Sequence, residues 1–235
     1  MHQILDPKIP LSIAAWLGVS LVLLSAKLGL SLSTKAVVSA VDFFILSVMF
    51  ANPVWRFVWN RTGFIGRWLS RKIYPDLNGT YDVLLESNWP VVKQMLDAAR
   101  KEALPFNPFD LDQPSPPLLS VELEAVIAQS WFEIKMCMRP KKPGAVIERS
   151  ETLATVPTKD AGNGEKGLVY VFRQENASRA ATDDPFFEGA TRLRIDRTDQ
   201  TILTGEYWNN RAWHRGINAA GKLRLVRRSA KTKNT

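Results

Sequence analysis

From Ser120 to Met138 the chain reads SVELEAVIAQSWFEIKMCM, and these nineteen residues alternate in a way that indicates β structure. One face of the first part carries apolar side chains and one amide, at Val121, Leu123, Ala125, Ile127, Gln129 and Trp131. A period of two is typical of a β-strand with one buried face. The apolar positions then move by one residue, to Ile134, Met136 and Met138. This shift predicts a β-bulge near Phe132 within a continuous strand, and it leaves open that the stretch forms two strands.

Six more segments on either side of this stretch also read as strands. They are Asn78–Ser87, Val146–Val156, Lys166–Gln174, Phe186–Asp196, Thr201–Arg211 and Lys222–Arg228. The first places Tyr81, Val83 and Leu85 on one face. Seven or eight antiparallel strands within about 160 residues fit a small closed barrel or a sandwich. The sequence therefore predicts a mostly β fold, and we assign the β domain to residues 76–228.

Residues 88–118 interrupt this β pattern. Asn88 is a candidate helix cap and Pro90 suits a first helical turn. An apolar stripe follows, at Val92, Met95, Leu96, Ala99 and Ala103. Five prolines in the next fifteen residues exclude regular structure there. We expect a helical, proline-rich insertion, which is either a short helix packed on one barrel end or a lid over a pocket mouth.

Two apolar stretches precede the β domain. Ile9–Ala26 contains eighteen residues without a charge, and Ala36–Ala51 is interrupted only by Asp42. With their flanks, both reach the roughly 20 residues that a membrane-spanning helix needs. The sequence predicts a two-helix transmembrane hairpin over residues 1–60. An intramembrane carboxylate such as Asp42 usually faces a partner helix or a cavity, which suggests a homo-oligomer.

Basic residues set the expected orientation of this hairpin. Five follow the second apolar stretch, and two lie in the loop between the stretches: Arg56, Arg61, Arg67, Arg71 and Lys72 against Lys27 and Lys35. The excess of positive charge predicts that both termini are cytoplasmic, in a multi-pass membrane protein. Residues 61–75 mix tryptophan with arginine, which is typical of a juxtamembrane linker at headgroup depth.

The formal net charge of +8 is unevenly distributed. Residues 1–75 hold eight Lys and Arg against two acids, and residues 222–235 hold six against none. Residues 76–221 hold seventeen bases against twenty-one acids. A nucleic-acid-binding domain would carry the basic excess itself, so we expect no nucleic-acid partner. Residues 229–235 read as a disordered basic tail.

The chain has few of the residues that disulfides, metal sites and common active sites need. Cys137 is the only cysteine, and His2 and His214 are the only histidines, so we expect no disulfide and no metal site. No nucleophile elbow, P-loop or dinucleotide-binding glycine pattern occurs. We therefore expect that the protein is not an enzyme and has no cofactor.

Polar and aromatic residues recur on the faces that alternation turns inward. They are Tyr81, Gln129, Trp131, Ser150, Tyr170, Tyr207, Asn209 and Arg211. An inward arginine among aromatic rings and amides suits a flat, anionic ligand, because rings stack on bases and guanidinium binds phosphate bidentately. An eight-stranded barrel has room for one small ligand. The other interpretation is that the tyrosines are core residues and Arg211 is a solvated strand end.

The whole pattern resembles a known family. Two apolar stretches, a basic-aromatic junction and the motif Tyr74-Pro-Asp-Leu-Asn-Gly-Thr-Tyr81 are similar to the SMODS-associating, two-transmembrane, β-strand-rich effectors of CBASS anti-phage systems. Later motifs fit the remaining strands in order: Gln129-Ser-Trp131, Glu148-Arg-Ser-Glu151, Leu168-Val-Tyr170, Gly189–Leu193 and Gly205–Arg211. The long insertion at 88–118 and Tyr81, where the family often has tryptophan, depart from the pattern.

This resemblance implies a lipocalin-like barrel that binds a cyclic dinucleotide made by a partner nucleotidyltransferase. It implies that binding promotes oligomerisation, after which the spans disrupt the bacterial inner membrane and the cell dies. It also implies roles for the inward residues. Four aromatic residues would stack on the bases or line the pocket: Tyr81, Trp131, Tyr170 and Tyr207. Four polar residues would bond base edges and phosphates: Gln129, Ser150, Asn209 and Arg211.

Three other classes stay open at this point. The barrel could be a membrane-tethered carrier of lipid or fatty acid, which an aliphatic inward face would favour. It could be a membrane-bound hydrolase of phospholipid or nucleotide, or a scaffold that binds no ligand.

Overall fold

The structure is a computed structural model, and it describes most of the chain from residue 63 onwards. The described residues are 16, 18–20, 23–29, 36, 39–40, 43, 53–54, 56–57, 63–101, 106–110, 112–130, 133–145, 147–160, 162–176 and 185–229. The chain divides into two compact units, residues 1–76 with 129–133, and residues 77–128 with 134–235. The first unit contains the helix α4 (Phe64–Lys72), which lies within the predicted juxtamembrane linker.

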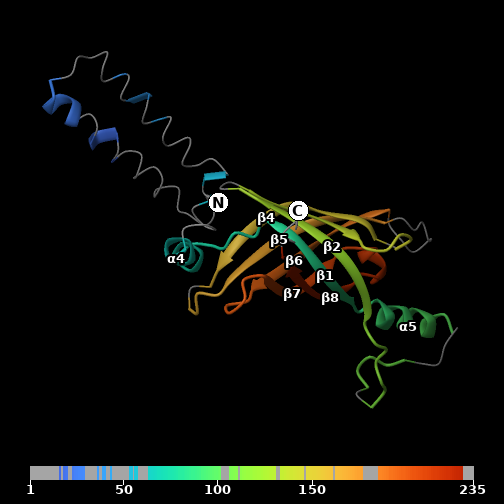
Figure 1. The fold of residues 1–235 in the computed structure, drawn as a ribbon. Helices are drawn as coiled ribbons and strands as arrows, with labels where there is room; N and C mark the ends of the chain where they lie inside the picture. The colour runs from blue at the N-terminus through green and yellow to red at the C-terminus, as the bar shows by residue number, and fades with distance from the viewer. Residues whose placement is uncertain are drawn as a thin grey trace, which may run out of the picture. The chain divides into compact units, whose positions relative to one another are not determined.

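The second unit is built on a closed antiparallel barrel (Figure 1). The strands follow one another around the barrel in chain order, and β8 pairs with β1 to close it. Their bounds are β1 Gly79–Ser87, β2 Leu119–Gln129, β3 Ile134–Pro140, β4 Ile147–Lys159, β5 Lys166–Asn176, β6 Phe186–Ile195, β7 Ile202–Asn209 and β8 Ala220–Arg227. The predicted mostly β, eight-stranded barrel is confirmed.

Alternation explains which side chains fill the interior. On β1, Tyr81, Val83 and Leu85 are buried, as their period of two predicts. On β2 the buried residues include Leu123, Ala125, Ile127 and Gln129, and on β3 they are Ile134, Met136 and Met138. The side chains between them are half-buried or exposed on the outer face. Burial of one face of each strand supplies the main apolar driving force for the barrel.

The predicted bulge near Phe132 is wrong, and the alternative of two strands is correct. β2 ends at Gln129, β3 begins at Ile134, and the two are neighbours in the barrel. The Ser130 amide donates to the Glu133 carbonyl oxygen across the connection, at 2.8 Å. The apolar positions shift by one because the chain turns back there. The strand pairing shifts register on β4 instead, between Ile147 and Arg149 and between Thr152 and Ala154.

Two glycines let the strands approach closely where the barrel curves. A Cβ atom on Gly205 would overlap the Arg192 carbonyl oxygen, and one on Gly221 would overlap the Glu86 carbonyl oxygen. The Tyr207 ring also lies only 2.7 Å from the position of a Gly221 Cβ. Glycine inside a strand commonly marks such a tight bend in a barrel.

The predicted helix in the insertion is present as α5 (Trp89–Ala99), with Pro90 in its first turn (Figure 1). Asn88 does not form the expected side-chain cap. Its Oδ1 instead accepts from the Ala220 amide at 2.9 Å, which ties the helix start to β8. Along the predicted apolar stripe, Val92 is buried against Ala212 and Ile217, and Trp89, Met95 and Leu96 pack on the same cluster. The helix is therefore held on the connection between β7 and β8.

The predicted hairpin over residues 1–60 lies mostly outside the described residues. Within the part of the chain that the structure describes, no helix has both the length and the apolar character that crossing a membrane requires. The basic tail at 229–235 is described only at residue 229.

Candidate ligand site

A small cavity lies among the inward-facing side chains of the barrel. Its volume is about 20 Å³. It is lined by residues from all eight strands: Leu85, Leu123, Met138, Ile147, Ser150, Tyr170, Phe172, Gln174, Thr191, Tyr207 and Leu223. Three of the predicted site residues, Ser150, Tyr170 and Tyr207, are therefore brought together here. A space of this size holds one water molecule.

Thr191 is the most informative residue of this cavity. It is fully buried on β6, and its Oγ1 has no hydrogen-bond partner among the described residues. It pairs in register with Tyr170 on β5, whose ring is also buried. Burial raises the pKa of the Tyr170 phenol well above its usual range, and the Thr191 side chain on the neighbouring strand opposes part of that rise. Buried polar groups are nearly always bonded, so a water molecule in the cavity or a polar group of a ligand would bond to this hydroxyl.

Tyr207 lines the same cavity from β7. It is 7% exposed on β7, and burial raises the pKa of its phenol while the adjacent Ser87 opposes the rise. Ser87 is the last residue of β1, immediately before Asn88 and α5. Ser150 on β4 pairs with Gln174 on β5, and both line the cavity. The site thus combines two hydroxyl side chains, Ser150 and Thr191, and one amide with the two phenols.

The side chains of Tyr81 and Gln129 have internal hydrogen bonds instead. Tyr81 is completely buried, and its hydroxyl donates to the Leu77 carbonyl oxygen at 2.8 Å. The Gln129 amide donates to the Pro75 carbonyl oxygen at 3.3 Å. Neither residue lines the cavity. In this structure both side chains stabilise chain segments, as the core interpretation of the inward residues expects.

Asn209 is the last residue of β7, and Arg211 lies in the turn that follows it. The Asn209 Oδ1 accepts from the amides of Ala219 at 2.9 Å and Arg211 at 3.3 Å, which fixes the turn toward β8. The Arg211 guanidinium carbon lies 4.2 Å from the centroid of the Trp89 ring on α5, a cation–π contact. Burial lowers the pKa of Arg211. The expectation that Arg211 continues the inward face of Tyr207 is wrong, because the strand stops at Asn209. Trp131 lies outside the described residues.

The interior is packed rather than hollow. Small-ligand pockets usually measure about 300–1,000 Å³, whereas this cavity is about 20 Å³. No charged side chain lines it in the described part of the barrel. The prediction of a wet, cationic interior ready for a nucleotide is therefore not met in this conformation. A ligand of that size would need the barrel end to open.

Sequence reasoning missed two polar residues of the cavity, Gln174 and Thr191. Period-two alternation in the sequence could have identified both residues. Gln174 follows Tyr170 and Phe172 at a period of two, and Thr191 precedes the inward Leu193 by the same spacing. Among the described residues, no group of three or more histidine, cysteine, aspartate or glutamate side chains could hold a metal ion.

The fold and this site define a class, the small closed antiparallel barrels whose interior can hold a single ligand. A family model described as "Cap15, cyclic dinucleotide receptor domain" matches residues 116–227, from just before β2 to the end of β8. The CD-NTase-associated protein 15 of Escherichia albertii is 28% identical to the chain over 181 residues, which cover 77% of this chain and 74% of that protein. Both similarities bear out the resemblance drawn from the sequence.

Proposed function

We propose that the barrel binds a cyclic dinucleotide made by a partner nucleotidyltransferase, and that the chain acts as a CBASS effector without catalysis. The observation that carries the proposal is the buried, unpartnered Thr191 hydroxyl at a cavity shared with two phenols and an amide. The match to a cyclic dinucleotide receptor domain over the same strands supports it.

The side chains of the cavity suit the base of such a ligand. Hydroxyl and amide groups hydrogen-bond base edges, and the faces of tyrosine and phenylalanine rings stack on bases. The phosphates need cations, and none lines the cavity in the described barrel. Arg211, four residues after Tyr207, is the phosphate ligand that we propose, because its charge is held at the α5 end of the barrel. It would exchange the Trp89 ring for a phosphate on binding.

Binding requires that α5 move away from this end. In the described part of the chain, the contacts that hold it include the cluster of Val92, Ala212 and Ile217, the Trp89–Arg211 contact, and two hydrogen bonds between Asn88 and Ala220. A cluster of this size is weak enough to open locally without unfolding the barrel. This assigns the insertion the role of a lid, one of the two roles that its sequence leaves open.

The membrane part of the function follows from the sequence. We propose that residues 1–60 form a two-helix hairpin in the bacterial inner membrane, with both termini in the cytoplasm. Ligand binding would favour an oligomer only by differential affinity, since equal affinity for both states shifts nothing. Oligomerised hairpins would then disrupt the bilayer and kill the infected cell. Dye release from liposomes carrying the full-length chain, with and without ligand, tests this step.

Thermal unfolding of the full-length chain with a panel of cyclic dinucleotides tests the binding proposal. A ligand at 100 times its Kd should add about 2.7 kcal/mol to the free energy of unfolding. The linear dinucleotides of the same bases are matched controls and should give no shift. If no cyclic dinucleotide raises the melting temperature, the proposal is wrong. Chromatography of the same mixtures should recover the ligand unchanged, and product formation would instead indicate an enzyme.

A lipid or fatty-acid carrier is the second candidate, and one observation favours it. Most of the cavity wall is apolar, with Leu85, Leu123, Met138, Ile147 and Leu223 among its residues. An acyl chain would pack against these apolar side chains, but it could not form a hydrogen bond with the Thr191 hydroxyl. Native mass spectrometry of the purified chain distinguishes the two, because a carrier should retain a bound lipid.

A further inference from the structure

A groove lies on the outer face of β5, beside the turn that joins β4 to β5. Strand pairing places Thr158 of β4 and Arg194 of β6 on either side of Gly167. Gly167 has no side chain, so it forms the floor between them. The hollow has a volume of about 410 Å³, and small-ligand pockets usually measure about 300–1,000 Å³. We call it the β5 groove, and its lining residues include Thr158, Lys159, Lys166, Gly167, Arg192 and Arg194.

Positive charge exceeds negative charge in the β5 groove. Four cations line it against two carboxylates: Lys159, Lys166, Arg192 and Arg194 against Asp160 and Glu165. The Asp160 carboxylate is already bonded within the turn, because its Oδ1 accepts from the amides of Gly162 at 2.8 Å and Asn163 at 3.0 Å. Burial lowers the pKa of Lys166 to about 8, and the positive charge of Lys159 contributes to the fall. An anion in the groove would offset this surplus of positive charge.

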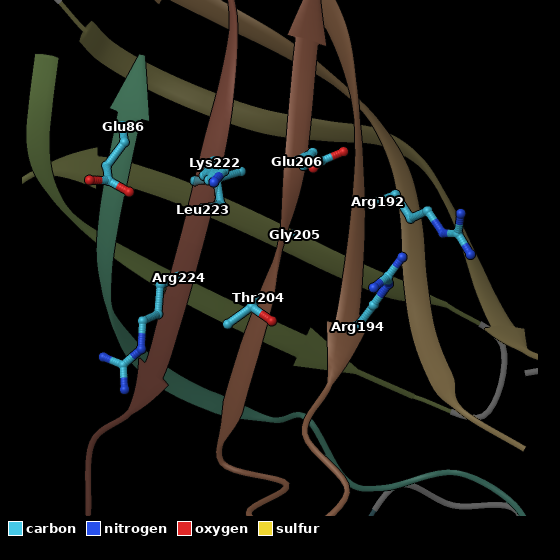
Figure 2. Close-up of a pocket in the computed structure, with 9 residues that line it drawn as sticks. All are labelled: Glu86, Arg192, Arg194, Thr204, Gly205, Glu206, Lys222, Leu223 and Arg224. Atoms are coloured by element: carbon cyan, nitrogen blue, oxygen red, sulfur yellow. The ribbon is translucent and has the colours of Figure 1, made fainter. Parts of the chain in front are cut away.

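Arg194 is the cation in this groove that is best placed to bind an anion. In the described part of the chain, its side chain forms no ion pair and no hydrogen bond. Arg197, at the same end of the barrel, is bonded instead, because it donates to the Asn163 carbonyl oxygen at 3.2 Å. Figure 2 shows the side chains of Arg192 and Arg194 next to each other, with both guanidinium groups turned away from Glu206. The two groups therefore lie on the β5 side of their strand, where the groove is.

We propose that the β5 groove binds the phosphate of an anionic phospholipid headgroup and holds this end of the barrel on the bilayer surface. Arginine donates two parallel hydrogen bonds to phosphate, so the Arg194 guanidinium fits one pair of its oxygens. Arg192 lies two residues away on the same face, about 6.7 Å along the strand, and can bind the same phosphate. The Thr158 hydroxyl faces them across Gly167 and can donate a further hydrogen bond. Glu165 would accept from a hydroxyl group of the headgroup, so the chemistry fits phosphatidylglycerol.

The position of the groove explains why a lipid would supply this phosphate. The start of β1, the end of β8, the β6–β7 turn and the β4–β5 turn share one end of the barrel. The chain therefore enters the barrel at the end that carries the groove. β1 begins at Gly79, nineteen residues after the end of the predicted hairpin, and a linker of that length spans at most about 65 Å. A bilayer that holds the hairpin thus presents its headgroups to the groove at high effective concentration.

The inference rests on the proposed hairpin, which brings the bilayer, and it does not depend on a cyclic dinucleotide. The competing explanation is that basic side chains are attracted to any anionic surface without forming a site. Replacing Arg194 by lysine separates the two explanations. Lysine keeps the charge, but it cannot form the two parallel hydrogen bonds of a guanidinium group.

Energy transfer from the barrel to the bilayer surface measures the docking. The full-length chain with Cys137→Ser and Thr198→Cys carries a fluorescent donor on the β6–β7 turn, because Thr198 is exposed there and lies outside the groove. The chain is reconstituted into nanodiscs in which a small share of the lipid headgroups carries the acceptor. Nanodiscs of phosphatidylglycerol are compared with nanodiscs of phosphatidylcholine, whose headgroup has no net charge and no hydroxyl group.

We expect more energy transfer in phosphatidylglycerol than in phosphatidylcholine, because docking brings the donor to the surface. Arg194→Gln should lower the ratio of docked to undocked chains about fivefold. Arg194→Lys should lower it at least about threefold, since the bidentate contact is lost, and Arg192→Gln should lower it as well. Arg139→Gln is the matched control and should leave the ratio unchanged, because Arg139 is exposed on β3 toward the other end of the barrel.

Equal transfer in the two lipids would overturn the proposal. An Arg194→Lys variant that behaves like the parent would do so too, because diffuse attraction would then explain the docking. If soluble glycerol 3-phosphate lowers transfer in phosphatidylglycerol to the phosphatidylcholine level, the groove binds a free phosphate ester and the lipid source is wrong. A chain that does not enter nanodiscs at all would contradict the hairpin as well, which distinguishes failure of the hairpin from failure of the groove.

Discussion

Replacing Thr191 by valine should raise stability and lower ligand affinity at once. Valine has the shape of threonine without the hydroxyl, so Thr191→Val keeps the packing of β6 against Tyr170. It removes a buried oxygen that has no partner among the described residues. Thr191→Val should raise the free energy of unfolding and lower ligand affinity together only if the Thr191 hydroxyl bonds to the ligand.

The size of both effects follows from the burial of the group. Leaving a buried polar group unbonded costs about 1–3 kcal/mol, so the variant should gain about 1–2 kcal/mol without ligand. For a domain of this size that gain corresponds to about 2–8 °C in melting temperature. Loss of one hydrogen bond to the ligand should weaken binding about tenfold, equivalent to about 1.4 kcal/mol.

Differential scanning calorimetry of the full-length chain measures the first effect, and calorimetric titration with the bound cyclic dinucleotide measures the second. Thr204→Val is the matched control, because Thr204 is exposed on the outer face of β7. It should change neither quantity appreciably. A lower melting temperature for Thr191→Val with unchanged affinity would show that the hydroxyl serves the fold, and our reasoning about the cavity would be refuted.

Three further variants test separate parts of the structure. Arg211→Met removes the cation that lies 4.2 Å from the centroid of the Trp89 ring. Amide hydrogen exchange in α5 should therefore accelerate about 2–30-fold, and ligand affinity should fall. Unchanged affinity would exclude Arg211 as the phosphate ligand. Gly221→Ala should lower the free energy of unfolding by more than about 2 kcal/mol in urea titrations. Gly162→Ala is the control and should be neutral, because a Cβ atom there would make only an ordinary van der Waals contact. Equal effects of the two substitutions would contradict the close approach of the strands at Gly221. Burial lowers the pKa of Lys166 from 10.5 to about 8, so the folded state binds fewer protons between these pH values and stability should rise with pH across them. Lys166→Met should therefore be more stable than the parent at pH 7, by about 1–3 kcal/mol, with the difference gone above pH 10.5; a difference independent of pH would count against burial of the charge.

Alternation along the chain was sufficient to predict the strands and most of the interior. Tyr81, Tyr170 and Tyr207 are all buried, because a period of two fixes the face of a residue once its strand is known. The same rule failed at Arg211. The pattern of alternate residues continues past Asn209, but the strand does not, and Ala212 already has a φ of 39° in the following turn. A sequence pattern does not reveal where hydrogen bonding to the neighbouring strands stops.

The size of the cavity also could not be predicted from alternation. Alternation says that Phe172 and Leu223 point inward, but not how completely their side chains fill the barrel. Whether a polar inward residue faces a ligand or a backbone group depends on distant segments. Tyr81 bonds the Leu77 carbonyl oxygen, and only the path of the chain before β1 brings that oxygen within reach.

Calorimetric titration of the full-length chain with cyclic dinucleotides is the most direct test of the central claim, that this barrel is a receptor for such a ligand. We predict saturable binding of at least one of them, with one ligand for each barrel and a negative heat-capacity change as α5 and the cavity wall rearrange around it. A folded chain that gives no binding heat with any cyclic dinucleotide across a range of temperatures would contradict the account.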